Sequence, residues 1–547
     1  MNDSDPTSSE TTSRSVPADP GIAPLPNSSG SQLARNVLVN YASLGASLVF
    51  SFFLTPIVLR HTGAADYGLW ITIISAGGYL GLLDSGVSTA AVREVAICRA
   101  RADEQRLAEL FGTLRLFFLG TALIALAVAG LVLPFLSNLL TLPRGSVVAA
   151  QLSVLLMGVG TALGFLKSVP AAALYGGGRS DVLAVLGMLT ALTTQGAQIA
   201  AVLLGGGIVS IFGASVVGSA LGLVLSVVAA RRTGMQPKSA RSGSAEMMKH
   251  LLRSGSRNMI SGLGGSISYE LDAVIIAAVL PIAKVAPYDL ALSTSNLARS
   301  VATTGTNLLL PTYAHADAIE DSNRQFRLYS RAMLASLALT GSFVIALLAF
   351  GQDLLQVWLG AVPKDTYVVL VVLNLVYLLQ LPGHQSFVYL TSVGRNKLLA
   401  QLSLPVGIAN VALSVAATVW LGPVGPAVGS LPQVALLDFL ILPLMCCRAM
   451  SVEYALYWKR SILPLVLPFT AAGATAALLR ATARGSIYLS IPEAIAVVFV
   501  ACIVLVAVLY RTDAESRTAM RRLGRWPSSV RKPGRRVAAS GRTTPDT

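Results

Sequence analysis

The sequence is short of charged side chains. Asp, Glu, Lys and Arg make up 12% of its 547 residues, against about a quarter in soluble domains. A soluble protein of this length needs more polar surface than that, and 54% of the residues here are apolar. The composition therefore excludes an ordinary soluble enzyme, a disordered chain and a fibrous repeat, and it indicates a membrane protein with many spans.

Residues and motifs that carry chemistry are also scarce. The sequence has no GxxxxGK[ST] phosphate loop, and its four histidines are scattered along the chain. The four cysteines show no metal-ligand spacing, and we interpret them as small apolar fillers: Cys98, Cys446, Cys447 and Cys502. We therefore expect no cofactor, no metal site and no catalytic residues, as in a protein that is not an enzyme.

Long stretches without charge predict the spans. No charged residue occurs between 182 and 230, or between 398 and 437, and each stretch is long enough for two helices of about 20 residues. Glycines at 205–207 and the sequence Gly422-Pro423 break these stretches in the middle. The same reasoning along the chain predicts fourteen spans, near 37–59, 68–90, 114–136, 147–175, 182–204, 208–230, 259–281, 286–312, 333–357, 366–393, 399–421, 425–447, 462–480 and 488–510.

The distribution of basic residues predicts the orientation. With fourteen spans and the N-terminus inside, 32 of the 41 Lys and Arg residues fall in cytoplasmic segments and six in outside loops. This asymmetry follows the positive-inside rule. We therefore expect a protein of the cytoplasmic (inner) membrane with both termini in the cytoplasm, and the net charge of +15 indicates membrane topology and anionic lipid rather than a nucleic-acid partner.

An internal repeat groups the spans. Arg35–Asn36 opens the first span and Arg257–Asn258 opens the seventh, 222 residues later, and a tyrosine follows each span, at Tyr67 and at Tyr288. Two parallel repeats of six spans are typical of a two-lobed secondary transporter. We expect a disordered cytoplasmic tail (1–34), an N-lobe with spans 1–6 (35–230), a basic cytoplasmic linker (231–257), a C-lobe with spans 7–12 (258–447), spans 13–14 as an added helix pair (448–510) and a basic cytoplasmic tail (511–547).

A motif near the N-terminus resembles one transporter family. The stretch TPIVLRHTGAADYGLW contains an L-R-x-x-G-x-x-x-Y-G-L turn, and the following span ends L-x-D-x-G with an Arg-Glu exit at Arg93–Glu94. This pattern is similar to the polysaccharide transporter family, the O-antigen flippase type, of the superfamily that also contains multidrug exporters and lipid II flippases. The resemblance implies a two-lobed helical bundle that flips polyprenyl-diphosphate-linked oligosaccharides by alternating access. It also implies lipids, and a polysaccharide polymerase and a chain-length regulator, as partners.

Two basic residues inside predicted spans are candidates for substrate binding. Lys167 lies in the fourth span and Arg299 near the middle of the eighth. A charge inside a membrane usually faces a cavity or a partner, and a diphosphate headgroup would need a cationic cavity. The alternative is that Lys167 extends to the interface and that Arg299 pairs with Asp272 or Glu270.

The acidic residues inside spans are candidates for proton coupling or gating. Glu270 and Asp272 are two residues apart, so they point about 200° apart on a helix and do not share a face. We favour Asp272 for coupling, while Asp84 could bond to a nearby helix end or act as a gate with Arg93. Asp438 is a further charge within a predicted span.

Two other functions are compatible with the sequence. A cation-coupled multidrug exporter of the same superfamily would need an acidic, aromatic cavity for organic cations. A membrane glycosyltransferase or polymerase would need a large loop outside the membrane, and the longest predicted outside loop has only about ten residues.

Overall fold

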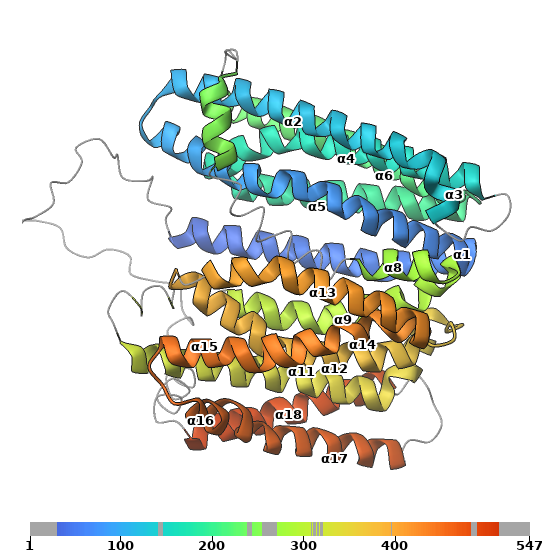
Figure 1. The fold of residues 1–547 in the computed structure, drawn as a ribbon, viewed down its shortest axis with the longest axis vertical. Coiled ribbons are helices and arrows are strands. Elements are labelled where there is room, and N and C mark those ends of the chain that lie inside the picture. Colours follow the sequence, from blue (N-terminus) through green and yellow to red (C-terminus); the bar gives the residue numbers. More distant parts are fainter. Residues whose placement is uncertain are drawn as a thin grey trace, which may run out of the picture. The chain divides into compact units, whose positions relative to one another are not determined.

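The computed structural model describes residues 30–139, 146–237, 243–253, 271–307, 309, 313, 317, 321–394, 397–482 and 490–512, and Figure 1 shows its fold. Within these ranges the regular elements are helices, and no strand occurs. Nine of the described helices are long and apolar enough to cross a membrane, judged by length and composition. The chain is therefore an all-helical, multi-pass membrane protein, as its composition predicts.

The first half of the chain consists of long helices that begin and end close to the predicted spans. Their bounds are α1 (Gly30–Ala100), α2 (Glu104–Val132), the short α3 (Leu136–Leu139), α4 (Val147–Gly176), α5 (Ser180–Leu203) and α6 (Ile208–Arg232). Residues 245–253 of the linker are also helical.

The second half continues in the same way, with two π-helical interruptions. Its elements are α8 (Asp272–Val279), η2 (Ile282–Lys284), α9 (Val285–Asn307), α11 (Ser322–Leu359), α12 (Thr366–Ser392), α13 (Lys397–Leu421), α14 (Gly425–Gln433), the π-helical η4 (Val434–Ile441), α15 (Leu442–Ala449), α16 (Tyr454–Tyr457), the π-helical η5 (Trp458–Ile462), α17 (Val466–Thr482) and α18 (Ser490–Thr512). The seventh predicted span is described only from residue 271 onward.

Two glycines make the turns that the sequence places between neighbouring spans. α1 contains the first two predicted spans, and its backbone is not helical at Gly63, with φ 83° and ψ 169°. This conformation is open almost only to glycine, because a Cβ would collide with the backbone. Gly205, with φ 83°, plays the same part between α5 and α6.

The described residues form two compact units. The first contains residues up to 295 together with 358–376 and 394–435, and the second contains 296–357, 377–393 and the residues from 436 onward. The lobe boundaries expected from the repeat stay a prediction.

In the first unit, α2, α4, α5 and α6 lie side by side (Figure 1). One face of α2 is buried in a core that includes Leu110, Phe111 and Phe118. Its other face exposes Leu119, Leu123 and neighbouring apolar side chains. An apolar face without a protein partner is what a helix presents to lipid.

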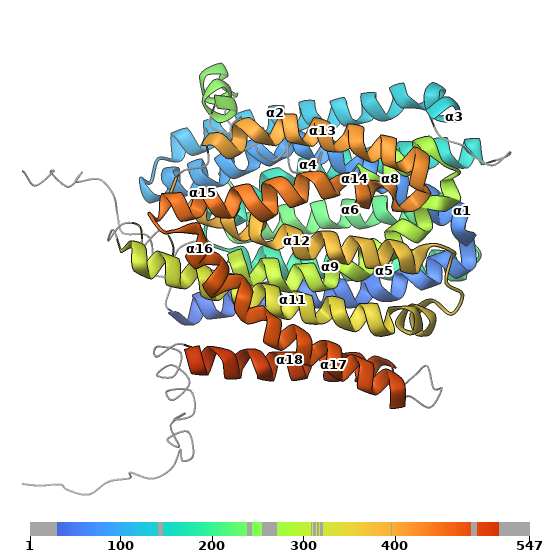
Figure 2. The ribbon, with the colours of Figure 1, turned by 60° about the horizontal axis from the view of Figure 1, so that its bottom comes forward.

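In the second unit, α17 and α18 pack against each other (Figure 2). Small side chains make the close contact possible: Ala472 and Ala476 of α17 and Ala501 of α18 are buried beside Phe350 of α11. Residues that are small allow helix backbones to approach in a membrane, where packing drives association.

Candidate functional site

Asp84 is held by hydroxyl groups. It lies on α1 and is half-buried. Its Oδ2 accepts a hydrogen bond from Ser168 Oγ of α4 at 2.8 Å, and its Oδ1 accepts one from Ser88. The carboxylate therefore links α1 to α4, and a gating role for it with Arg93 stays a prediction.

Lys167 precedes Ser168 on α4 and points towards α6. Its Nζ lies 3.5 Å from the position that a Cβ on Gly222 of α6 would take. No hydrogen bond or ion pair to Lys167 occurs among the described residues. The glycine leaves room for the ammonium group, which has no carboxylate partner in this part of the chain. Its expected part in substrate binding stays a prediction.

Arg299 lies over an aromatic ring in the second unit. Its guanidinium carbon is 5.1 Å from the centroid of the Tyr377 ring, so the two side chains join α9 to α12. Such a cation–π contact stabilises a charge away from water. The predicted pairing of Arg299 with an acidic residue of span seven, and its place in a cavity shared with Lys167, stay predictions.

Asp272 opens α8 and bonds to a neighbouring helix. Its Oδ2 accepts a hydrogen bond from the hydroxyl of Tyr288 on α9. Glu270, the other carboxylate proposed for this span, lies outside the described residues. The Asp272 carboxyl group thus has a hydroxyl donor in Tyr288. The proton-coupling role predicted for it stays a prediction.

A second tyrosine–aspartate pair joins the two copies of the sequence repeat. The hydroxyl of Tyr67 on α1 donates to Asp289 Oδ2 on α9, and Tyr67 is fully buried. Sequence reasoning matched Tyr67 with Tyr288 but missed Asp289, which directly follows Tyr288. The signal was available, since a carboxylate inside a predicted span needs a partner.

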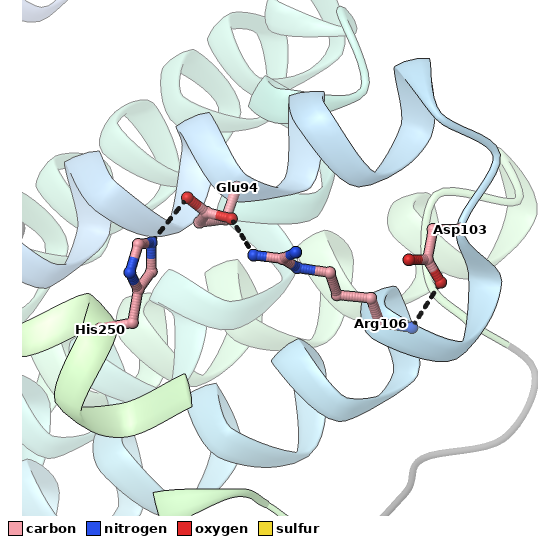
Figure 3. Close-up of polar contacts among 4 residues, drawn as sticks. All are labelled: Glu94, Asp103, Arg106 and His250. Carbon is pink, nitrogen blue, oxygen red and sulfur yellow. Dashed lines mark hydrogen bonds and ion pairs between the residues drawn. The ribbon is translucent and has the colours of Figure 1, made fainter. Parts of the chain in front are cut away.

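Three ionisable side chains form a cluster near the loop that joins α1 and α2 (Figure 3). Glu94 of α1 has a side chain only 9% exposed, and its Oε1 lies 3.1 Å from His250 Nε2. Its Oε2 lies 3.5 Å from Nη2 of Arg106 on α2. Asp103 caps α2 by accepting from the backbone N–H of Arg106 at 2.9 Å. We call Glu94, Arg106 and His250 the linker cluster.

The linker cluster fastens part of the predicted linker to the first unit. Met247 and Leu251 of the helical segment 245–253 are buried in the same core as Leu107 and Phe111 of α2. The Ser244 N–H donates to Thr113 Oγ1 at 3.1 Å. An open pocket of about 420 Å³ lies beside this contact. Because apolar and polar contacts act together, we interpret the cluster as a positioning device.

Metal and thiol chemistry find no support in the part of the chain that the structure describes. It contains no group of three or more His, Cys, Asp or Glu side chains that could hold a metal ion. Cys98 is 1% exposed, and burial raises the pKa of its thiol. A buried thiol with a raised pKa is a poor nucleophile, which agrees with the interpretation of the cysteines as fillers.

Comparisons with known proteins bear on the whole chain. A family model described as "Polysaccharide biosynthesis protein" matches residues 33–316, a range that contains the motif at the Gly63 turn and all of the first six predicted spans. Among proteins with curated descriptions, none matches this sequence.

Solved structures share the fold. A lipid II flippase MurJ in an inward closed conformation aligns with a TM-score of 0.67 and 13% sequence identity, over 87% of this chain and 99% of that one. An inward-facing multidrug resistance MATE family transporter of the MOP superfamily aligns with a TM-score of 0.54 and 17% identity, over 77% of this chain and 96% of that one. At such low identity the similarity shows a shared helical transporter fold.

Proposed function

The chain belongs to the polysaccharide biosynthesis protein family, and from this we propose that it is a flippase for a polyprenyl-diphosphate-linked oligosaccharide. It moves this repeat unit of a surface polysaccharide across the cytoplasmic membrane by alternating access. The fold is shared with a structure named as a lipid II flippase. The proposal makes the protein a transporter and assigns it no catalytic step.

The observation that carries the proposal is the unpaired cation in α4. Lys167 is half-buried in an apolar helix that is long enough to span the membrane. No carboxylate among the described residues forms an ion pair with it. A charge in this setting needs a counter-charge or water. The diphosphate of the substrate supplies the counter-charge when it is bound.

Arg299 provides the second proposed contact. Its guanidinium stacks on the Tyr377 ring, and a guanidinium group binds phosphate oxygens through the N–H groups in its plane. An aromatic ring beside a phosphate-binding group also suits a sugar, whose apolar face stacks on such rings. We therefore propose that Arg299 is a second contact for the headgroup during the flippase cycle.

The membrane setting follows from the sequence. We propose that both termini are cytoplasmic and that the membrane is the inner one, because 32 of the 41 basic residues lie on one predicted side. The polyprenyl tail stays in lipid while the headgroup crosses. A polysaccharide polymerase and a chain-length regulator are the proposed protein partners.

A multidrug exporter is the alternative, supported by the fold shared with a MATE family transporter. Such a protein needs carboxylates that can receive organic cations. In this chain Asp84 and Asp272 already accept hydrogen bonds from side-chain hydroxyls. Lys167, which forms no ion pair with a described carboxylate, favours the anionic substrate.

Binding of undecaprenyl diphosphate to the purified full-length protein in lipid nanodiscs tests the proposal. A charged hydrogen bond contributes about 1.5–3 kcal/mol, so Lys167→Gln should weaken binding by roughly 10-fold to 100-fold. Lys167→Arg should keep most of the affinity. Arg299→Gln should weaken binding similarly if both cations hold the diphosphate.

Arg115→Gln is the matched control, because Arg115 lies exposed on α2 and its loss removes the same unit of charge. This variant should bind within about twofold of the wild type, since an exposed charge contributes little. Equal affinities for the wild type and for Lys167→Gln would contradict the proposal. Binding of organic cations instead, lost in Asp84→Asn, would establish the multidrug exporter.

A further inference from the structure

Asp438 is a buried carboxyl group in an irregular helix. It lies in the π-helical segment η4, within the run Pro405–Ala449 that is long and apolar enough to span a membrane. The side chains of Leu436 and Leu440 on the same segment are 59% and 41% exposed, whereas Asp438 is 7% exposed. Asp438 therefore points into the protein while its neighbours face outward.

The facing helix, α12, leaves space for this carboxyl group. Asp438 lies against Gly383 of α12, and a Cβ added there would be 2.6 Å from the Asp438 Cα and closer still to Oδ1. No side chain fits at such a distance, so the glycine leaves space that the carboxyl group fills. The packing keeps the group in place and also keeps water from it.

Asp438 has no partner for a charge. Its Oδ2 is buried without a hydrogen-bond donor, and no ion pair reaches it from the residues that the structure describes. Elements beside η4 carry further titratable groups among the described residues, and Arg299 of α9 lies close enough to His384 to act on its charge. His384 follows Gly383 on α12 and has a buried Nε2 that also lacks a partner in the described chain. Tyr454 of α16 uses its hydroxyl on the Leu440 carbonyl at 3.4 Å.

Burial decides the protonation state. An ionised carboxylate that is removed from water and left without donors is strongly disfavoured, whereas the neutral acid loses little. Asp438 therefore holds its proton in this conformation. A π-helical turn inside an α-helix is often found at functional sites, and a change in its register would move the carboxyl group to other surroundings.

We propose that Asp438 is a proton-binding site within the membrane-spanning part of the second unit, and that it binds a proton in this conformation and releases it in another during transport. The binding of the proton goes beyond the proposed flippase activity and does not depend on it. The link between proton exchange and transport rests on that activity. Asp272, the coupling residue favoured by the sequence, differs because it has a tyrosine hydroxyl as donor.

Infrared spectroscopy tests the bound proton directly. The purified full-length protein in liposomes is titrated between acid and alkaline pH, in light and heavy water, and the carbonyl stretch of protonated carboxyl groups is recorded. Asp438→Asn should remove one carboxyl equivalent that stays protonated above the pH at which exposed carboxyl groups ionise. Asp353→Asn is the matched control and should remove none, because the guanidinium of Arg480 pairs with the Asp353 carboxyl group.

Identical protonated-carboxyl bands in the wild type and in Asp438→Asn would overturn the proposal. Asparagine has the shape of the neutral acid, so the variant should fold and unfold thermally like the wild type. Asp438→Ser provides a second neutral variant that removes the same band if the asparagine variant does not fold. Loss of the band in either variant supports the site.

Transport in proteoliposomes tests the proposed link between proton exchange at Asp438 and transport. With an imposed proton gradient, wild-type protein should translocate an undecaprenyl-diphosphate-linked oligosaccharide faster than without one, and Asp438→Asn should lose at least most of this difference. A variant that still responds fully to the gradient would overturn the coupling role. If the wild type moves no such lipid, the flippase proposal fails while the infrared result for Asp438 stands by itself.

Discussion

A tight contact between α1 and η2 in the first unit gives a testable prediction about Gly68. A Cβ on Gly68 of α1 would lie 3.1 Å from the carbonyl carbon of Ile282, closer still to its oxygen, and 3.4 Å from Val285 Cβ. The two nearest atoms belong to the backbone, so they cannot turn aside as a flexible side chain would. In Gly68→Ala, α1 and the segment η2 must therefore move apart.

The cost follows from this geometry. Overpacking a tight contact destabilises a protein by about 1–3 kcal/mol, and the Tyr67 hydrogen bond next to it would be disturbed as well. We expect the thermal unfolding midpoint of Gly68→Ala to fall clearly below that of the wild type. A dye that reacts with thiols can follow unfolding in detergent, because Cys98, Cys446 and Cys447 are buried and react only when the protein opens.

Gly81→Ala is the control for Gly68→Ala. Gly81 lies on the same helix, and a Cβ there would meet nothing within 4 Å. Alanine favours a helix over glycine by up to about 1 kcal/mol, so this variant should unfold at the same temperature as the wild type or higher. If Gly68→Ala and Gly81→Ala unfold together, the reasoning about the contact between α1 and η2 is wrong.

Two further predictions concern polar contacts. Tyr67→Phe removes the donor to the Asp289 carboxylate and should cost about 1–3 kcal/mol of stability, since a buried acceptor is left unsatisfied. Tyr457→Phe should be neutral in the same thermal assay, because the Tyr457 hydroxyl is buried without a partner in the described chain. Glu94→Gln should loosen the linker cluster by removing the charge that His250 and its basic neighbour share, and amide hydrogen exchange over residues 245–253 should become several times faster. Unchanged exchange there would show that apolar burial alone fastens the segment.

The motif that carries the family resemblance has a structural explanation. Gly63 makes the turn between two helices, and Gly68 permits the contact with η2. Tyr67 bonds across to α9, and Arg60 Nε donates to the Leu359 carbonyl at 2.9 Å. Each of these four motif residues thus makes a backbone turn or a tertiary contact. The pattern predicts a fold reliably, and for the same reason it does not identify a substrate.

Long apolar stretches made the helices predictable, since a membrane-spanning helix is formed by one uninterrupted run of about 20 mostly apolar residues. Partners of individual side chains were not predictable, because they come from elsewhere in the chain. Ser168 bonds to Asp84 across 84 residues, and Tyr67 bonds to Asp289 across 222. The π-helical turns around Asp438 were also not predictable, because the spacing of apolar residues along the sequence does not reveal a local change from α-helical to π-helical hydrogen bonding.

The partner of a membrane charge separates structural from functional candidates better than its position does. Asp84, Asp272 and Asp289 are alike in accepting hydrogen bonds from hydroxyl groups within the protein. Lys167 and Asp438 differ from them, since no described residue forms an ion pair or a side-chain hydrogen bond with either one. A buried polar group that lacks such a partner in the protein is stable only if a ligand, an ion or a proton supplies one. For the cation this is an anion, which the substrate headgroup would bring, and for the acid it is a proton, so these two residues are the ones whose variants should change transport more than folding.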